Sequence, residues 1–187
     1  MNRLIKGSLI LTYILLSYSF INIYRADSYA KSAEGSLKEL ELTQAQNFAT
    51  KAIQLNPNEP YYYRVLAKVY LTKSVSNTEY KDKTLSVLSA SLKLNTHNLA
   101  TIRNNTPIYY YLALNNIKNG TSSIDEKYLK HISNHMTKYK KVYPNDLGLI
   151  VLFAKYEKKL ELRESYKESI ERIKTLRPDI LTWYPGL

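Results

Sequence analysis

Two histidines have the spacing in this chain that most resembles a metal site. His131 and His135 stand four residues apart in a segment predicted to be helical, so their rings could share one face and bind a metal ion. No third ligand is evident beside them. The sequence therefore favours two exposed histidines on a basic helix, and no metal site is predicted.

Three glutamates, Glu157, Glu161 and Glu164, are spaced for acid–base chemistry on or near one helix end. They interleave with Lys158 and Arg163, a pattern that ordinary surface ion pairs explain. The chain contains no cysteine, no glycine-rich phosphate loop and no serine in a G-x-S-x-G turn. We therefore predict a protein that is not an enzyme, with no catalytic residue and no cofactor.

The composition indicates a folded chain with a basic surface. Of its 187 residues 44% are hydrophobic, and only 5 are Gly and 6 Pro, too few for a loop-rich or disordered chain. The formal net charge of +11 would attract phosphates, anionic lipids or acidic polymers. The abundant Lys, Asn, Ile and Tyr are also what a strongly AT-biased genome produces, so both explanations of the charge stay open.

Short echoes within the chain predict how these residues are positioned. The stretches "AIQLNPNE", "SLKLNTHN", "YKKVYPND" and "IKTLRPDI" begin at residues 52, 91, 139 and 173. Proline ends a helix because it has no amide hydrogen to donate, and it suits the first turn of the next helix. The echoes thus predict four helical hairpins, at about residues 26–56, 60–95, 99–143 and 147–177, with Asn56-Pro57 closing the first and Glu59-Pro60 opening the second.

Individual residues refine this picture. Pro107 should kink the first helix of the third hairpin or make it start late. Gly120 should stop one segment, and Ser122 or Ser123 should cap the next helix. Trp183 is expected to pack back on the last hairpin as an apolar cap. Among the tyrosines of the second hairpin, Tyr63 and Tyr70 are expected in the core, and Tyr61 and Tyr62 nearer the surface.

The hairpins resemble tetratricopeptide repeats, which are pairs of antiparallel helices with a period of about 34 residues. Tyr63, Leu66, Ala67 and Tyr70 fit the spacing of a first helix, and Ala45, Ala49, Ala52 and Pro57 that of a second helix. The resemblance implies an all-α solenoid of about four hairpins over residues 26–178, followed by a tail at residues 179–187.

A narrower resemblance covers residues 24–71, beginning "YRADSYAKSAEGSLKELELTQAQNF". This stretch is similar to the extracytoplasmic repeat tail of bacterial O-antigen ligase-related proteins. Those enzymes cross the membrane many times, whereas this chain has one candidate span, and the periplasmic loop with their catalytic arginines and histidine is absent. The resemblance therefore does not imply ligase activity.

In tetratricopeptide proteins the first helix of each pair lines the concave groove. That resemblance selects as groove residues Tyr61, Arg64, Lys68, Arg103, Tyr110, Val151, Lys155 and Lys158, with Asp27, Ala30 and Glu34 from the first hairpin. A basic, aromatic groove suits a protein or acidic peptide, or an anionic glycopolymer. A solvated lysine-rich face without a ligand is the open alternative, and nucleic acid is disfavoured.

Residues 7–24 contain no charged side chain and predict a membrane anchor. As a helix they are about 27 Å long, and adding Leu4 and Ile5 gives about 30 Å, the thickness of a hydrocarbon core. Residues 1–25 are thus expected to anchor the chain through residues 4–24, with the repeats outside the cytoplasm. A signal peptide cleaved after Ser28-Tyr29-Ala30 is the alternative.

These predictions combine into one functional hypothesis. The chain is expected to be a single-pass, membrane-anchored interaction scaffold without catalysis, serving cell-envelope polysaccharide assembly. The alternative is a divergent or truncated tail of an O-antigen ligase-like or polymerase-like membrane protein, with no activity of its own.

Overall fold

The computed structural model describes residues 2–115 and 123–187, and most of this length is helical. The chain forms two compact units, Met1–Thr96 and His97–Leu187, here called unit 1 and unit 2. Strands within the described residues are limited to β1 (Leu114–Asn115) and β2 (Ser123–Ile124), an antiparallel pair in which Leu114 lies opposite Ile124. The predicted all-α fold is therefore confirmed.

Unit 1 consists of α1 (Asn2–Lys38), α2 (Leu42–Leu55), α3 (Pro60–Ser74) and α4 (Glu79–Leu94). Each helix packs on the next, and α1 also contacts α3. The predicted breakers act as expected, because α2 ends just before Asn56-Pro57 and α3 begins at Pro60. The Glu59 side chain accepts a hydrogen bond of 3.0 Å from the backbone N–H of Tyr61 and so caps α3.

Alanines form the contact between α1 and α2. Ala45, Ala49 and Ala52 of α2 are fully buried, as predicted, and so are three alanines on α1, namely Ala26, Ala30 and Ala33. Small side chains let two helix backbones approach closely. The expectation that Ala30 faces a groove is wrong, because this methyl group belongs to the core.

The buried tyrosine of α3 is Tyr62, which is 1% exposed, whereas Tyr63 and Tyr70 are only partly buried. The prediction that Tyr63 and Tyr70 form the core and Tyr62 lies nearer the surface is therefore wrong. Tyr62 and Tyr63 are neighbours, so a shift of one residue exchanges the side chain that faces inward. Tyr62 fills the space beside Ala26, Ala30 and Ala52, where the small side chains leave room for its ring.

Replacing Tyr62 by phenylalanine is expected to lower the free energy of unfolding by about 1–2 kcal/mol, because its hydroxyl donates a 2.6 Å hydrogen bond to the Asp27 carboxylate. Thermal unfolding of the full chain in detergent, followed by circular dichroism, measures the change. The matched control is Tyr63→Phe, which removes an exposed bond of 3.0 Å to the Pro57 carbonyl. Equal losses in the two variants would contradict a special role for Tyr62.

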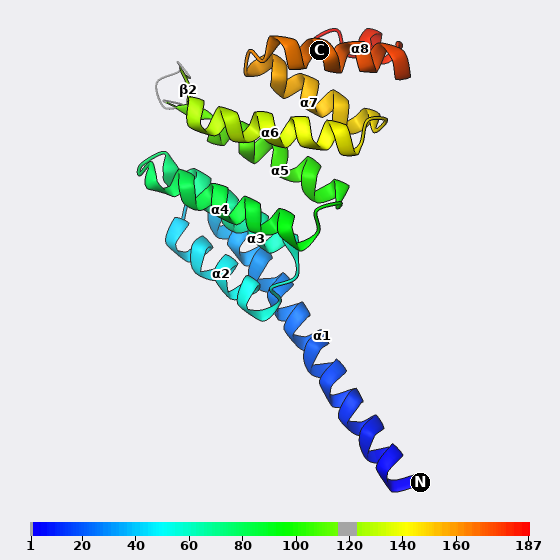
Figure 1. Cartoon of the computed structure of the whole chain (residues 1–187). Helices are drawn as coiled ribbons and strands as arrows, with labels where there is room; N and C mark the ends of the chain where they lie inside the picture. Colours follow the sequence, from blue (N-terminus) through cyan, green and yellow to red (C-terminus); the bar gives the residue numbers. More distant parts are fainter. Residues whose placement is uncertain (1, 116–122) are drawn as a thin grey trace. The chain divides into compact units, whose positions relative to one another are not determined.

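The amino-terminal part of α1 carries a band of exposed apolar side chains. Leu9, Ile14 and Phe20 are each more than half exposed, and the first fully buried residue of α1 is Ala26, which packs with residues of α2 and α3. Figure 1 shows this part of α1 running clear of α2, α3 and α4. Within Gly7–Lys38 the apolar window has a mean hydropathy of 1.4 and none of it is buried, so by length and composition α1 can cross a membrane.

Unit 2 consists of α5 (Leu99–Leu112), α6 (Glu126–Val142), α7 (Leu147–Lys159), α8 (Arg163–Leu176) and the short α9 (Ile180–Trp183). Helix α5 packs on α6 and α7, and α7 packs on α8. The Asn98 side chain caps α5 at Leu99, so this helix does not start late. It continues through Pro107 to Leu112, although the proline has no amide hydrogen for the Arg103 carbonyl and its ring crowds that carbonyl.

The cap of α6 differs from the prediction. Asp125 accepts from the backbone N–H of Lys127 at 3.2 Å and occupies the cap position, while Ser123 lies in β2. Gly120 and Ser122 lie outside the described residues. Asp125 caps the helix instead of a serine because the β1–β2 pairing keeps the chain extended up to residue 124, and α6 begins only after it.

The turns that follow α1 in unit 1 and α7 in unit 2 have the same backbone geometry. Leu40 and Glu161 have left-handed backbones, with φ of 61° and 57°. The following N–H group in each case reaches back five residues, from Glu41 to the Ser36 carbonyl at 2.8 Å and from Leu162 to the Glu157 carbonyl at 2.9 Å. This closure satisfies carbonyls that the helix end leaves without partners.

The segment after α8 folds back onto unit 2 without burying its tryptophan. Ile180, Leu181 and Leu187 pack against the cluster of Ile150, Ala154 and Ile173. Trp183 itself is 64% exposed, so the prediction that it serves as the apolar cap is wrong. The aliphatic side chains take that place and leave the indole on the surface.

Candidate functional site

Three of the predicted groove residues lie together on α3, beside α1. The Glu34 carboxylate accepts hydrogen bonds of 3.0 Å from both Lys68 Nζ and the Tyr61 hydroxyl. The Arg64 guanidinium lies over the Tyr61 ring, 5.1 Å from its centroid. Burial and the bond to Glu34 raise the pKa of Tyr61 to about 12, so its hydroxyl stays protonated.

Glu34 changes what this cluster can bind. Because the carboxylate pairs with Lys68, the net charge of the α3 surface is lower than the sequence suggested. Arg64 is partly buried, and burial lowers its pKa from the ordinary value. The cluster therefore connects α1 to α3 within unit 1, and much of its bonding capacity is used internally.

Arg103 and Tyr110, on α5 of unit 2, are also engaged. The Arg103 guanidinium pairs with Asp146, which in turn caps α7 by accepting from the Leu149 N–H at 2.8 Å. Gly148 makes room for this pair, since a Cβ atom there would lie 2.8 Å from an Arg103 guanidinium nitrogen. Tyr110 packs on the ring of Tyr156, with 4.8 Å between centroids.

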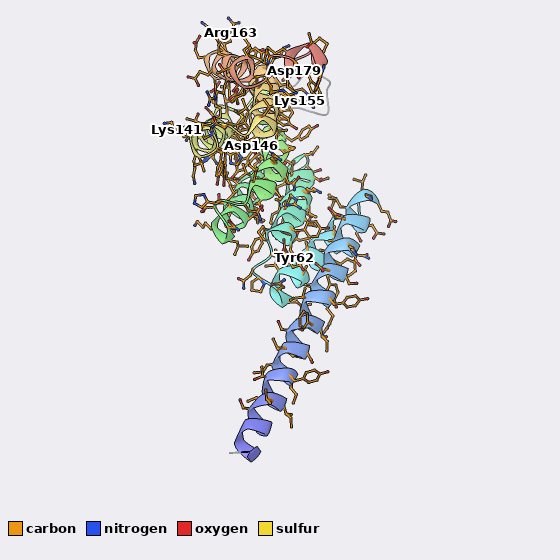
Figure 2. The ribbon with its side chains drawn as sticks, turned by 90° about the vertical axis from the view of Figure 1, so that its right-hand side faces the viewer. Tyr62, Lys141, Asp146, Lys155, Arg163 and Asp179 are labelled. Atoms are coloured by element: carbon orange, nitrogen blue, oxygen red, sulfur yellow. The ribbon has the colours of Figure 1, made fainter. Side chains whose placement is uncertain are left out.

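The remaining predicted residues line a cavity of about 760 Å³, here called the α7 pocket. One wall is α7, and the other is the last residue of α9 together with the segment that follows it. Lys155 on this helix is labelled in Figure 2, as is Asp179 at the start of the returning segment. The α7 wall is formed by Gly148, Val151, Leu152, Lys155, Lys158 and Lys159, and the opposite wall by residues 183–187.

The α7 pocket combines positive charge with exposed aromatic surface. Its described lining has three lysines and no Asp or Glu side chain. Lys155 is exposed, while Lys158 donates to the Gly186 carbonyl at 3.0 Å and so holds the returning segment in place. Trp183 and Tyr184 are 64% and 55% exposed. Such a site can pair with a carboxylate or another anion and cover an apolar or planar group beside it.

Sequence reasoning selected Val151, Lys155 and Lys158 but not the aromatic wall. The sequence predicts Trp183 as an apolar cap on the last hairpin and does not connect it with the groove residues. A usable signal was the pair Pro185-Gly186, which ends α9 early and leaves too few residues for a helix that could bury the indole.

Glu157 is buried, and this corrects the prediction of surface ion pairs. Its side chain has no exposed surface and lies 3.0 Å from Lys140 Nζ. The hydroxyls of Ser165 and Ser169 donate to its two oxygens at 2.6 and 2.7 Å. This cluster of Glu157, Lys140, Ser165 and Ser169 joins α6, α7 and α8. Its carboxylate has no exposed surface and is bonded by both serine hydroxyls, so the cluster stabilises the fold.

His135 is buried as well, so the prediction of two exposed histidines is wrong for this residue. Its ring lies 4.7 Å from that of Tyr109 and contacts Tyr139 and Phe153, whereas His131 is exposed. Residues 131 and 135 therefore do not share a metal-binding face. In the described part of the chain no group of three or more His, Cys, Asp or Glu residues could hold a metal ion.

Comparison with known proteins assigns no family to the chain. No protein-family model matches it, and no curated protein is significantly similar to it.

Proposed function

We propose that this protein is a membrane-anchored, TPR-like scaffold that binds an acidic segment of a partner protein in the α7 pocket. The anchor is α1, and the helical units stand outside the cytoplasm, where they serve cell-envelope polysaccharide assembly. The observation that carries the proposal is the α7 pocket, with three lysines and two exposed aromatic side chains around about 760 Å³.

Three features support a repeat architecture. Within each unit, successive helices of 13 to 17 residues pack as neighbours, from α2 to α4 in unit 1 and from α5 to α8 in unit 2. Alanines line the α1–α2 contact, as they do in tetratricopeptide hairpins. The turn closure at Leu40 recurs at Glu161, which suits two copies of one structural unit.

The pocket favours an acidic peptide because it offers a partner both for a carboxylate and for a neighbouring apolar side chain. A carboxylate can accept from Lys155, which is exposed and has no ion pair among the described residues. An apolar or aromatic side chain next to it can lie against Trp183 and the aliphatic surface of Val151 and Leu152. An anionic glycan would use the lysines but would leave the aliphatic wall without a partner.

Lys155→Gln should weaken binding of fluorescein-labelled poly-L-glutamate to the full chain by about 5- to 30-fold, because a partly desolvated contact between charged groups contributes about 1–2 kcal/mol. Fluorescence anisotropy in detergent, at low and moderate salt, measures the dissociation constant. The matched control is Lys130→Gln, on the exposed face of α6.

Equal weakening in both variants would mean diffuse charge attraction and would contradict a role for the pocket. A peptide that alternates glutamate with phenylalanine should bind more tightly than poly-L-glutamate and lose that advantage in Trp183→Ala. Tighter binding of polygalacturonate than of either peptide would instead assign the pocket to an anionic glycan.

A further inference from the structure

The packed part of unit 1, residues 26–94, has one end beside the point on α1 where the apolar segment stops. Tyr24 is 77% exposed, and two residues later Ala26 is fully buried against unit 1. Ala26 and Ala30 pack with Ala52 near the end of α2 and with Tyr62 in the first turn of α3. The α2–α3 turn, residues 56–59, therefore lies beside the start of the buried part of α1.

The height of this turn above the apolar segment follows from helix geometry. At a rise of about 1.5 Å per residue, Asp27 lies about 4.5 Å beyond Tyr24 along the axis of α1. The Tyr62 hydroxyl reaches Asp27 at 2.6 Å. Because the headgroup layer on each side of a bilayer is about 5–8 Å thick, the turn falls within that layer when residues 4–24 span the hydrocarbon core.

The last turn of α4 reaches the same end of unit 1. Ser91 donates to the carbonyl of Pro60, the first residue of α3, at 3.2 Å. Lys93 and Leu94 follow within the same turn and are both exposed. The end surface thus comprises the α2–α3 turn and the final turn of α4, here called the basal face.

The charges around the basal face suit lipid phosphates. Its carboxylates are engaged internally, since Asp27 accepts from the Tyr62 hydroxyl and Glu59 caps α3. Three cations are exposed at or near it, namely Arg25, Lys93 and Lys51, the last of which precedes the turn by about one helical turn and lies over the Tyr29 ring at 5.6 Å. Exposed Tyr24 adds an aromatic side chain of the kind enriched at membrane interfaces.

We infer that the basal face rests in the headgroup layer of the same bilayer that holds α1, with Arg25, Lys51 and Lys93 contacting lipid phosphates. The inference rests on the proposed membrane anchor. It means that the packed part of unit 1, residues 26–94, stands directly on the membrane, without a spacer between it and the anchor. The partner is the phospholipid surface itself.

The sequence has no cysteine, so single labels test this placement in the whole chain. A fluorophore is attached at Asn58→Cys on the basal face, at Thr43→Cys near the other end of α2, or at Tyr13→Cys in the apolar segment. The protein is reconstituted in phosphatidylcholine nanodiscs containing lipids with a headgroup nitroxide quencher. Quenching at Asn58→Cys is expected to be severalfold stronger than at Thr43→Cys, which lies about 20 Å farther along the helix direction.

The label at Tyr13→Cys separates failure of the inference from failure of the anchor. Protection of Tyr13→Cys from iodide, together with equal headgroup quenching at Asn58→Cys and Thr43→Cys, would overturn the inference and leave the anchor in place. Quenching of Tyr13→Cys by iodide would overturn both.

A second arm tests the charges, using nanodiscs with added phosphatidylglycerol. Quenching at Asn58→Cys should increase with anionic lipid in the natural background and not when Arg25, Lys51 and Lys93 are all changed to Gln. The matched control changes three exposed lysines elsewhere, Lys31→Gln, Lys83→Gln and Lys130→Gln. An equal response in the control triple variant and the basal triple variant would overturn the assigned lipid contacts.

Discussion

Replacing Glu157 by alanine is expected to lower the free energy of unfolding of unit 2 by about 3–5 kcal/mol, a loss typical of breaking a buried ion pair. The substitution leaves Lys140, whose side chain is only 15% exposed, without its 3.0 Å partner. It also leaves the hydroxyls of Ser165 and Ser169 without their acceptor. Urea unfolding of the full chain in detergent, followed by circular dichroism, measures the loss.

Two controls separate the buried pair from surface charge. Glu171→Ala breaks the exposed pair with Lys174 on α8 and should cost less than about 1 kcal/mol. Replacing Lys140 and Glu157 together by methionine should recover the part of the loss that comes from the unpaired Lys140, because two apolar groups of similar size leave no uncompensated charge, while the two serine hydroxyls still lack their acceptor. A Glu157→Ala variant as stable as Glu171→Ala would show that the buried charge is not held as described.

Acidification is expected to destabilise unit 2 through His135. Burial, with a smaller contribution from Lys138, lowers the pKa of His135 from 6.5 to about 3. In the unfolded chain the ring takes up a proton near pH 6.5, whereas in the folded unit it stays neutral until about pH 3. The stability that depends on the neutral ring is thus complete above pH 6.5 and declines as the pH falls, by about 2 kcal/mol at about pH 5.

His135→Gln should remove this pH dependence. The Thr106 hydroxyl donates to the Ile102 carbonyl at 2.8 Å, so its oxygen can accept from His135 Nε2 at 3.3 Å, and a glutamine amide can replace that donor. Urea unfolding at about pH 7 and about pH 5 compares the variants. The exposed His131 supplies the control, and a His131→Gln variant that flattened the pH dependence as much as His135→Gln would refute the assignment.

The sequence allowed the helix ends to be predicted better than the helix faces. Asn56-Pro57 and Glu59-Pro60 act locally through backbone geometry, so the end of α2 and the start of α3 were predicted correctly. Which tyrosine turns inward depends on the partner surface, and the alanines of α1 that receive Tyr62 stand more than thirty residues away. Glu157 and His135 were misjudged for the same reason, since their partners come from other helices.

The same distinction between local and long-range features applies to the candidate site. Spacing within α7 placed Lys155 and Lys158 on one side of the helix, and both line the α7 pocket. Glu34, which pairs with Lys68, and the opposite wall formed by Trp183 depend on long-range packing. Whether the residues selected on α3, α5 and α7 act together in binding stays a prediction.

The unbroken course of α1 also fixes a rotational phase. Each residue of an α-helix turns the chain by about 100° and advances it by about 1.5 Å. One residue inserted between Tyr24 and Arg25 would therefore turn every surface of unit 1 by about 100° around the anchor, towards a different neighbour in the membrane plane. Seven inserted residues would restore the direction to within about 20° and raise unit 1 by about 10 Å. The length of this segment can thus change without reorienting unit 1 only in steps near whole helical turns.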